Sequence, residues 1–369
     1  KSEHHKALAS LFISDLFDPR FFRNNQSPLH LFSILMKVFF KISLVLALFF
    51  AMNWLYEQTL LKSYLELEAE QYLQMKKIAS CDVIYFSESS NFSPDNSNDN
   101  DRSKLSQFIA QHYPNQQFEA VNKPAAHAGT YGHLLELIPK DSEVRTIIIA
   151  VNLRSFGASW IHSELESALN KSNVMYNQRP PLLNRFLVSL NAYDNASEAD
   201  RKKQMLSEWG KPNLPYSEPH NTVNNWCAEE KWGDWKNPKR QLADQFIKQF
   251  ALVIDEENPR VKDLDAIVDL AQKSSWNLVY SIIAEDVIAA DSLVGTDLTS
   301  LMKSNAAWLE SRYSSKGIKV INNLEVLSSA HFVDKDFPTE HYDETGRRII
   351  AEQVAKAIRP YMIDQKQKP

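Results

Sequence analysis

Glycine is scarce in this chain, with only 8 residues among 369. Loops that cradle phosphate groups use glycine so that the backbone can approach the ligand, and this scarcity argues against such a site. Lysine and arginine form no run, and the formal net charge is −5 at pH 7. A nucleic-acid binder usually carries a basic face, so we expect no nucleic-acid partner.

Cysteine is rarer still, with two residues, Cys81 and Cys227, far apart in the sequence. Neither has a second ligand at the spacing typical of a zinc site, so we expect no metal. Outside the cytoplasm the two thiols could form one disulfide. Both could equally remain free and buried, since Cys81 opens an apolar run.

The chain does contain one long apolar segment near its N-terminus. Residues 42–56 carry no charge, and a helix over residues 35–56 has close to the ~20 residues needed to cross a bilayer. Basic residues precede this segment and Glu57 opens an acidic stretch after it, which predicts a cytoplasmic tail over residues 1–34. We therefore expect a single-pass protein of the cytoplasmic membrane with its C-terminal domain outside. The alternatives are a buried core helix and a cleaved signal peptide.

The rest of the chain is predicted to form a stalk and an extracytoplasmic α/β domain. Residues 57–76 have helical spacing without a breaker and would continue the membrane helix, so that the domain covers residues 77–369. Five apolar, β-branched runs predict strands at 82–86, 118–121, 146–151, 277–283 and 318–322. Helical patterns lie between most of them, which favours a parallel sheet covered on both faces.

Two further segments complete the predicted domain. The interval of about 160–275 interrupts the alternation and is expected to be a helical insertion. Its tryptophans would either pack it onto the domain or form a sugar-stacking platform. A closing helix is predicted to start at the capping residue Asp343 and to end near Pro360.

Polar residues gather where the predicted strands end. The segment SESSN follows the first strand, NKPAAHAGTYG the second and NLRSFG the third, and DKDFPTEHYDETG precedes the closing helix. Ligand crevices of parallel sheets form at the carboxyl ends of the strands. A nucleophilic hydroxyl needs a base, a group that orients the base, and donors for the oxyanion, and all these kinds of group occur here.

These segments resemble the SGNH hydrolase superfamily, in which a strand is followed by Gly-Asp-Ser and Asp-x-x-His precedes the last helix. VIYFSES fits the first block with Glu88 at the Asp position, so the resemblance implies Ser89 as nucleophile and His341 as base. The position three before His341 is a proline. Asp336, Asp334 or Glu340 would then have to supply the acid, and Asp336 is favoured because a residue next to the histidine cannot easily reach back to its ring.

The same resemblance implies an oxyanion site. Gly129 would supply a backbone donor beside the Ser89 amide, and Asn152 a side-chain amide. Arg154 is a candidate for binding an anionic substrate, against the simpler alternative of a salt bridge. For the other residues the simpler roles are helix capping for Ser89, a tight bend at Gly129, a turn cap for Asn152 and a surface position for His341.

The layout as a whole is similar to DltD-type proteins of teichoic-acid D-alanylation and to the SGNH partners of polysaccharide O-acetylation. It implies an SGNH-like (flavodoxin-like) parallel sheet of about five strands, with a helical insertion and one preceding transmembrane helix. The implied function is a membrane-anchored serine esterase or O-acyltransferase of a teichoic acid or polysaccharide. It would use no cofactor and would act beside a multi-spanning membrane acyltransferase. The alternative is a non-catalytic accessory protein that binds a polymer or such a partner.

Overall fold

The computed structural model describes residues 28–194 and 196–362. The chain divides into two compact units, residues 1–60 and residues 61–369. The predicted tail over residues 1–34 falls mostly outside the described residues.

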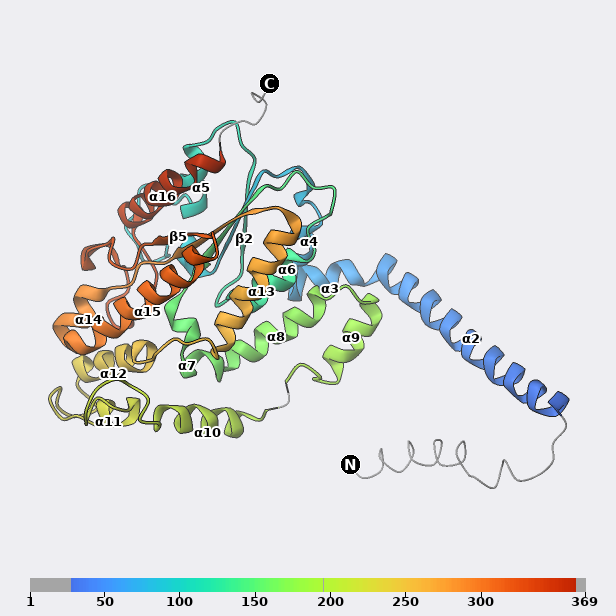
Figure 1. The fold of residues 1–369 in the computed structure, drawn as a ribbon, viewed down its shortest axis with the longest axis horizontal. Coiled ribbons are helices and arrows are strands. Elements are labelled where there is room, and N and C mark those ends of the chain that lie inside the picture. Colours follow the sequence, from blue (N-terminus) through green and yellow to red (C-terminus); the bar gives the residue numbers. More distant parts are fainter. Residues whose placement is uncertain (1–27, 195, 363–369) are drawn as a thin grey trace. The chain divides into compact units, whose positions relative to one another are not determined.

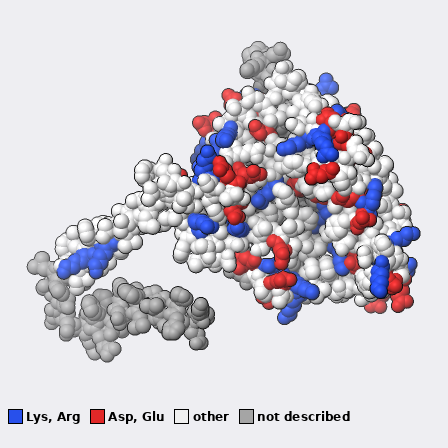
Figure 2. Space-filling model, turned by 180° about the vertical axis from the view of Figure 1, so that it is seen from behind, with Lys and Arg blue, Asp and Glu red and all other residues white. Residues whose placement is uncertain are grey.

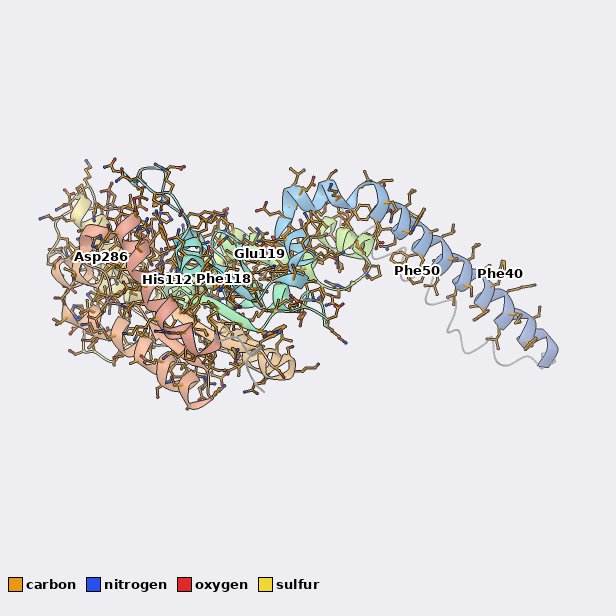
Figure 3. All side chains as sticks on the ribbon, turned by 90° about the horizontal axis from the view of Figure 1, so that it is seen from above. Phe40, Phe50, His112, Phe118, Glu119 and Asp286 are labelled. Carbon is orange, nitrogen blue, oxygen red and sulfur yellow. The ribbon has the colours of Figure 1, made fainter. Side chains whose placement is uncertain are left out.

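The described part of the first unit is one helix, α2 (Pro28–Thr59). Its stretch Phe32–Thr59 has a mean hydropathy of 2.3, and its most apolar window is not buried against protein. Figure 3 shows Phe40 and Phe50 projecting from this helix, and both are exposed. At 1.5 Å per residue, α2 is long enough to cross ~30 Å of hydrocarbon.

The expected continuous helix over residues 57–76 is broken in the structure. It is replaced by the end of α2, by α3 (Leu61–Glu68) and by α4 (Glu70–Met75). Leu65 and Met75 are buried in the second unit, and the Gln74 side chain donates 2.8 Å to the Ala120 carbonyl. Burial of these side chains makes residues 61–76 part of the globular domain rather than a free stalk.

The second unit is built on a five-stranded parallel sheet with the order β2-β1-β3-β4-β5 (Figure 1). The strands are β1 (Val83–Ser87), β2 (Phe118–Asn122), β3 (Thr146–Val151), β4 (Asn277–Ile282) and β5 (Lys319–Asn322). All five predicted strands are confirmed, as is the α/β fold class. The strand order reverses between β1 and β3, which makes the carboxyl ends of these two strands the expected ligand crevice.

Every side chain of β1 and β3 is buried. Both faces of the sheet are therefore covered, and helices form both covering layers. On one face, Tyr85 and Ile148 share a core with α5 (Leu105–Gln111) and α16 (Glu344–Ile358). On the other face, Phe86 contacts Tyr131 of α6 (Ala128–Leu135), and Tyr280 bonds to the Leu264 carbonyl. Alternate residues of one strand thus face opposite layers of helices.

The segment between β3 and β4 is helical, as the sequence predicts. Its elements are η4 (Leu153–Phe156), α7 (Ala158–Ile161), α8 (Glu164–Tyr176), α9 (Pro181–Ser189), α10 (Glu198–Trp209), α11 (Val223–Cys227), α12 (Pro238–Phe250) and α13 (Pro259–Ser274). The last of these packs on α6 and β4 as the crossover helix. Trp226 is fully buried and stacks on His220 at 4.3 Å, whereas Trp235 is exposed.

The remaining described elements are η2 (Ile78–Ser80), η3 (Ser89–Asn91), α14 (Val287–Leu293), α15 (Thr296–Ser315), η5 (Ser329–His331) and η6 (Arg359–Tyr361). Cys81 and Cys227 are both free and buried. On the face shown in Figure 2, basic and acidic side chains are interspersed over the domain.

Candidate active site

The turn after β1 is fixed by a set of short polar contacts. The Ser87 hydroxyl donates 2.5 Å to the Asn122 side-chain oxygen, which also accepts 2.6 Å from the Asn91 amide. Asn91 in turn accepts 2.7 Å from the backbone N–H of Ser106. These contacts tie the ends of β1 and β2 to the start of α5, so the short helix η3 and its first residue, Ser89, are held in one position.

Ser89 lies between two buried carboxylates. Its hydroxyl donates 2.6 Å to Oε1 of Glu340 and lies 3.2 Å from Oε2 of Glu88. The side chain of Glu88 also caps η3 by accepting 2.9 Å from the Ser90 N–H. Ser89 itself is half-buried, whereas Glu88 and Glu340 are almost completely enclosed. The serine therefore faces an acidic environment at the point where the strand order reverses.

One buried guanidinium serves this acidic cluster. Arg154 forms an ion pair with Glu340, donates 2.8 Å to the Pro338 carbonyl, and has its Nε 3.7 Å from Oε1 of Glu285. Arg154 is only 4% exposed. Its guanidinium is therefore paired inside the protein, with Glu340 and with the Pro338 carbonyl. Anion binding by Arg154 stays a prediction.

Glu285, which follows β4, is the third carboxyl group of the cluster. Burial raises the pKa of Glu285 to about 8, an effect that Arg154 opposes and that the charges of Glu88 and Asp286 strengthen. A carboxyl group with this pKa carries a proton at pH 7. At neutral pH Glu285 is therefore mostly protonated. This lowers the negative charge of the cluster, so no cation besides Arg154 is needed to balance it.

His341 forms a separate pair with an aspartate. Its Nδ1 lies 2.7 Å from Oδ2 of Asp334, which also accepts 2.7 Å from the Thr339 hydroxyl, while Oδ1 accepts 3.2 Å from the Asn96 amide. Burial favours the protonated carboxyl, but these hydrogen bonds outweigh it and lower the pKa of Asp334. An ionised Asp334 fixes the ring orientation and leaves Nε2 as the nitrogen that can exchange a proton.

The geometry changes the choice of acid. Asp336, which the sequence argument favours, is exposed, and Asp334 is the aspartate that lies beside the ring. The Glu340 side chain points away from the ring of His341, its neighbour in sequence, and accepts a hydrogen bond from Ser89. Within residues 28–194 and 196–362, no hydrogen bond joins Ser89 to His341, and the serine hydroxyl donates to Glu340 instead.

The two predicted oxyanion residues differ in their surroundings. Asn152 is buried at the end of β3; its Oδ1 accepts 2.9 Å from the Arg154 N–H, and its Nδ2 has no partner in the described part of the chain. Gly129 donates its N–H 3.2 Å to Nδ1 of His127. A Cβ at Gly129 would lie 2.7 Å from Oδ2 of Asp263 on α13. This atom is the end of an aspartate side chain, so the close contact alone does not require a glycine. Asn152, by contrast, retains a donor without a partner in the described residues.

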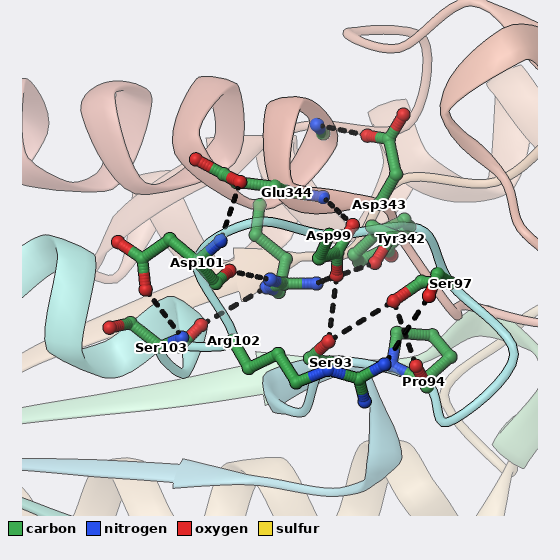
Figure 4. A network of polar contacts seen from close by, with 12 residues as sticks. Ser93, Pro94, Ser97, Asp99, Asp101, Arg102, Ser103, Tyr342, Asp343 and Glu344 are labelled. Atoms are coloured by element: carbon green, nitrogen blue, oxygen red, sulfur yellow. Dashed lines mark hydrogen bonds and ion pairs between the residues drawn. The ribbon is translucent and has the colours of Figure 1, made fainter.

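A network of polar contacts around Asp99 holds the loop after η3 against the start of α16 (Figure 4). Arg347 on α16 is fully buried and lies 2.7 Å from Oδ2 of Asp99, whose Oδ1 accepts 2.8 Å from the Glu344 N–H. Burial opposes ionisation, but hydrogen bonds from Ser93, Arg347 and neighbouring groups lower the pKa of Asp99 to about 2. The pair anchors the loop after η3 and thereby brings Asn96 to Asp334.

Several residues of this site are not apparent from the sequence pattern. The pattern points to Glu88 only as a departure from the Gly-Asp-Ser block, and it does not single out Glu285, Asn96 or Asn122. Two of them had a visible signal, since Asn122 and Glu285 directly follow apolar runs that end at the same edge of the sheet. Asn96 carried no such signal, because it reaches Asp334 across 238 positions of sequence.

Comparison with known proteins gives matches only at the level of structure. No protein-family model and no curated protein matches the chain. A candidate acylhydrolase from Bacteroides fragilis aligns at 8% identity and a TM-score of 0.37, over 80% of this chain and 97% of its own. A candidate platelet activating factor from Streptococcus pneumoniae aligns at 8% identity and a TM-score of 0.36, over 86% and 99%. A GDSL-like lipase from Bacteroides thetaiotaomicron aligns at 8% identity and a TM-score of 0.32, over 82% and 98%. Similarity of this degree does not establish a family, so the functional argument depends on the geometry of the site.

Proposed function

We propose that the chain is a membrane-anchored serine esterase or O-acyltransferase of SGNH type, in which Ser89 attacks an acyl carbonyl. The observation that carries the proposal is the position of the Ser89 hydroxyl. It lies at the carboxyl end of β1, where the strand order reverses, and the segment before α16 supplies a histidine, His341, whose ring Asp334 orients.

In the proposed mechanism, Glu340 releases the hydroxyl and His341 Nε2 accepts its proton. The Ser89 Oγ–carbon bond forms, and the carbonyl oxygen becomes an oxyanion that the free amide N–H of Asn152 stabilises. When the tetrahedral intermediate collapses, the ester C–O bond breaks and His341 returns the proton to the departing alcohol. Water or an acceptor hydroxyl then attacks the acyl-serine by the same route, with His341 again as base.

Glu340 has a defined part in this proposal. It pairs with Arg154 and accepts the hydrogen bond of the resting Ser89 hydroxyl, so that hydroxyl points at Glu340 rather than at a ring nitrogen. Rotation of the Glu340 side chain toward Arg154 alone would free Ser89. Glu340 is therefore a positioning residue, and the base remains His341.

The substrate in this proposal is an acyl ester of a cell-surface polymer, either teichoic acid or polysaccharide. The support is the apolar helix α2, which would keep the domain at a membrane. The outer side is proposed from the basic residues before the apolar segment and the acidic residues after it. A multi-spanning acyltransferase that supplies the acyl group remains an expectation from the resemblance.

One observation favours a non-catalytic alternative. Ser89 bonds to Glu340 rather than to His341, and the cation of the site is used within the protein. A domain with this arrangement could bind a polymer or a membrane partner without turning over an ester.

The test uses the full chain in lipid nanodiscs. Release of p-nitrophenol from p-nitrophenyl acetate and labelling by a fluorescent fluorophosphonate are measured for wild type, Ser89→Ala and His341→Gln. Ser315→Ala and His112→Gln are the controls, since both positions are exposed. Loss of both signals in the two site variants, with the controls unchanged, supports the serine mechanism. A wild type that neither hydrolyses the ester nor reacts with the probe would refute it and favour the binding protein.

A further inference from the structure

Helix α9 presents an uncovered apolar face. Phe186 is 56% exposed and Leu190, one turn later, is 59% exposed, while Asn184 and Val188 on the other side are buried. Residues four apart lie on the same side of a helix, so Phe186 and Leu190 form one continuous surface. Contiguous exposed apolar surface is a feature of interaction sites.

Helix α9 contacts α3, which is the first helix of the domain after α2. Arg185 of α9 stacks over the Tyr64 ring of α3 at 4.2 Å, and Lys171 of the adjoining helix α8 pairs with Glu68 of α3 at 2.5 Å. Only Leu60 separates α2 from α3. Because consecutive Cα atoms are 3.8 Å apart, α3 starts within about 8 Å of the end of α2, whatever the angle between them.

The composition of α9 suits a lipid surface, whereas α3 beside it carries Glu66 and Glu68. Residues 181–189 contain no acidic side chain, and Arg185 is exposed beside Phe186. A further exposed apolar side chain, Leu67 of α3, lies on the helix that α9 contacts. An amphipathic helix with a basic flank lies in the headgroup region of a bilayer with its apolar side chains toward the acyl chains.

We propose that α9 is an interfacial helix whose Phe186 and Leu190 insert into the outer surface of the bilayer that α2 crosses. The inference rests on the membrane anchoring in the proposed function. It deepens that function, because a second membrane contact fixes the domain against the bilayer and holds the Ser89 site at a constant height above it.

Buried native thiols make a labelling test practical. Burial raises the pKa of the Cys81 thiol to about 12 and also raises the pKa of the Cys227 thiol. A thiol is unreactive in its protonated form, so a cysteine introduced at an exposed position will react selectively. We would introduce Phe186→Cys, Leu190→Cys and, as a control of similar exposure on α14, Ile288→Cys.

The full-length variants are spin-labelled in nanodiscs that contain phosphatidylglycerol. Accessibility to oxygen, which concentrates in lipid, and to a water-soluble nickel chelate is then measured by power-saturation electron paramagnetic resonance. We expect the labels at 186 and 190 to be several-fold less accessible to nickel and more accessible to oxygen than the label at 288. Equal nickel accessibility at all three positions would overturn the proposal.

A fourth label separates this inference from the anchoring on which it rests. Leu46 lies within the apolar stretch of α2, and Leu46→Cys should be shielded from nickel if α2 spans the bilayer. A shielded label at 46 with freely accessible labels at 186 and 190 refutes the interfacial helix alone. An accessible label at 46 refutes the membrane anchoring, and the interfacial helix with it.

Discussion

The ion pair between Asp99 and Arg347 allows a test of how the loop after η3 is held against α16. In Arg347→Met the buried Asp99 carboxylate loses its only ion-pair partner in the described residues, and the carbonyls of Tyr342 and Asp101 each lose a donor at 2.9 Å. Removing one member of a buried pair costs about 3–5 kcal/mol. At roughly 2–4 °C per kcal/mol for a domain of this size class, the melting temperature should fall by at least about 6 °C.

The neighbouring arginine provides the control. Arg348 pairs with Asp101 and Glu344 but is 46% exposed, and an exposed pair contributes about 1 kcal/mol or less. The control variant is Arg348→Met. Because Arg347→Met and Arg348→Met both replace arginine by methionine within α16, their effects on helix propensity are similar. Thermal unfolding of the full chain in nanodiscs, followed by tryptophan fluorescence, would measure the difference. Equal shifts for the two variants would refute the reasoning.

The pH dependence of that difference is a second check. A carboxyl group with a lowered folded pKa stabilises the protein above its unfolded pKa, and the contribution is lost as the pH falls through the folded value. For Asp99 that window lies between the ordinary 3.8 and about 2. The difference between wild type and Arg347→Met should therefore narrow as the pH falls toward 2. A difference that stays constant would place the effect outside the ion pair.

Three further predictions follow from the site and the core. Asp334→Asn should reduce ester hydrolysis by at least tenfold while Asp336→Asn leaves it near wild type, because only Asp334 contacts His341; kcat measured for both variants checks this, and the opposite ranking would restore Asp336 as the acid. Glu285 has a folded pKa raised from 4.5 to about 8, so the folded state binds the extra proton and stability should decline as the pH rises from about 4.5 to 8. Glu285→Gln should flatten that decline in denaturation curves recorded across the range, and an unchanged slope would contradict the assignment. Finally, Cys81 and Cys227 should resist maleimide at pH 7.5 in the folded protein and react fully in guanidinium, because burial raises both thiol pKa values; rapid labelling without denaturant, followed by mass spectrometry, would refute their burial.

The fold was predictable because its strands are short apolar runs between clear boundaries. TIIIAV coincides with β3, and the other four runs match their strands to within one residue at each end. The break after Thr59 was not predictable, since residues 57–76 contain no glycine or proline to interrupt a helix. It depends on tertiary burial of Leu65 and Met75, which no local pattern records.

The site was predictable in position but less so in its contacts. Strand ends located Ser89 and Asn152, because parallel strands bring their carboxyl ends to one edge. Sequence spacing misdirected the choice of acid to Asp336, since it is the fold of the loop before α16 that turns Asp334 toward His341. The contact between Ser89 and Glu340 could not be inferred, because these two residues are far apart in sequence and meet only in the folded chain.

The hydrogen bond between Ser89 and Glu340 joins positions 251 residues apart. During synthesis the serine is made long before its partner, so no chain that stops short of residue 340 contains the assembled site. The apolar side of α5 likewise stays uncovered until α16 arrives. Contacts this distant in sequence form slowly, because the intervening chain must first be ordered. The segment that carries Glu340, His341 and α16 therefore completes the site, and chains truncated before it carry a serine with neither residue beside it.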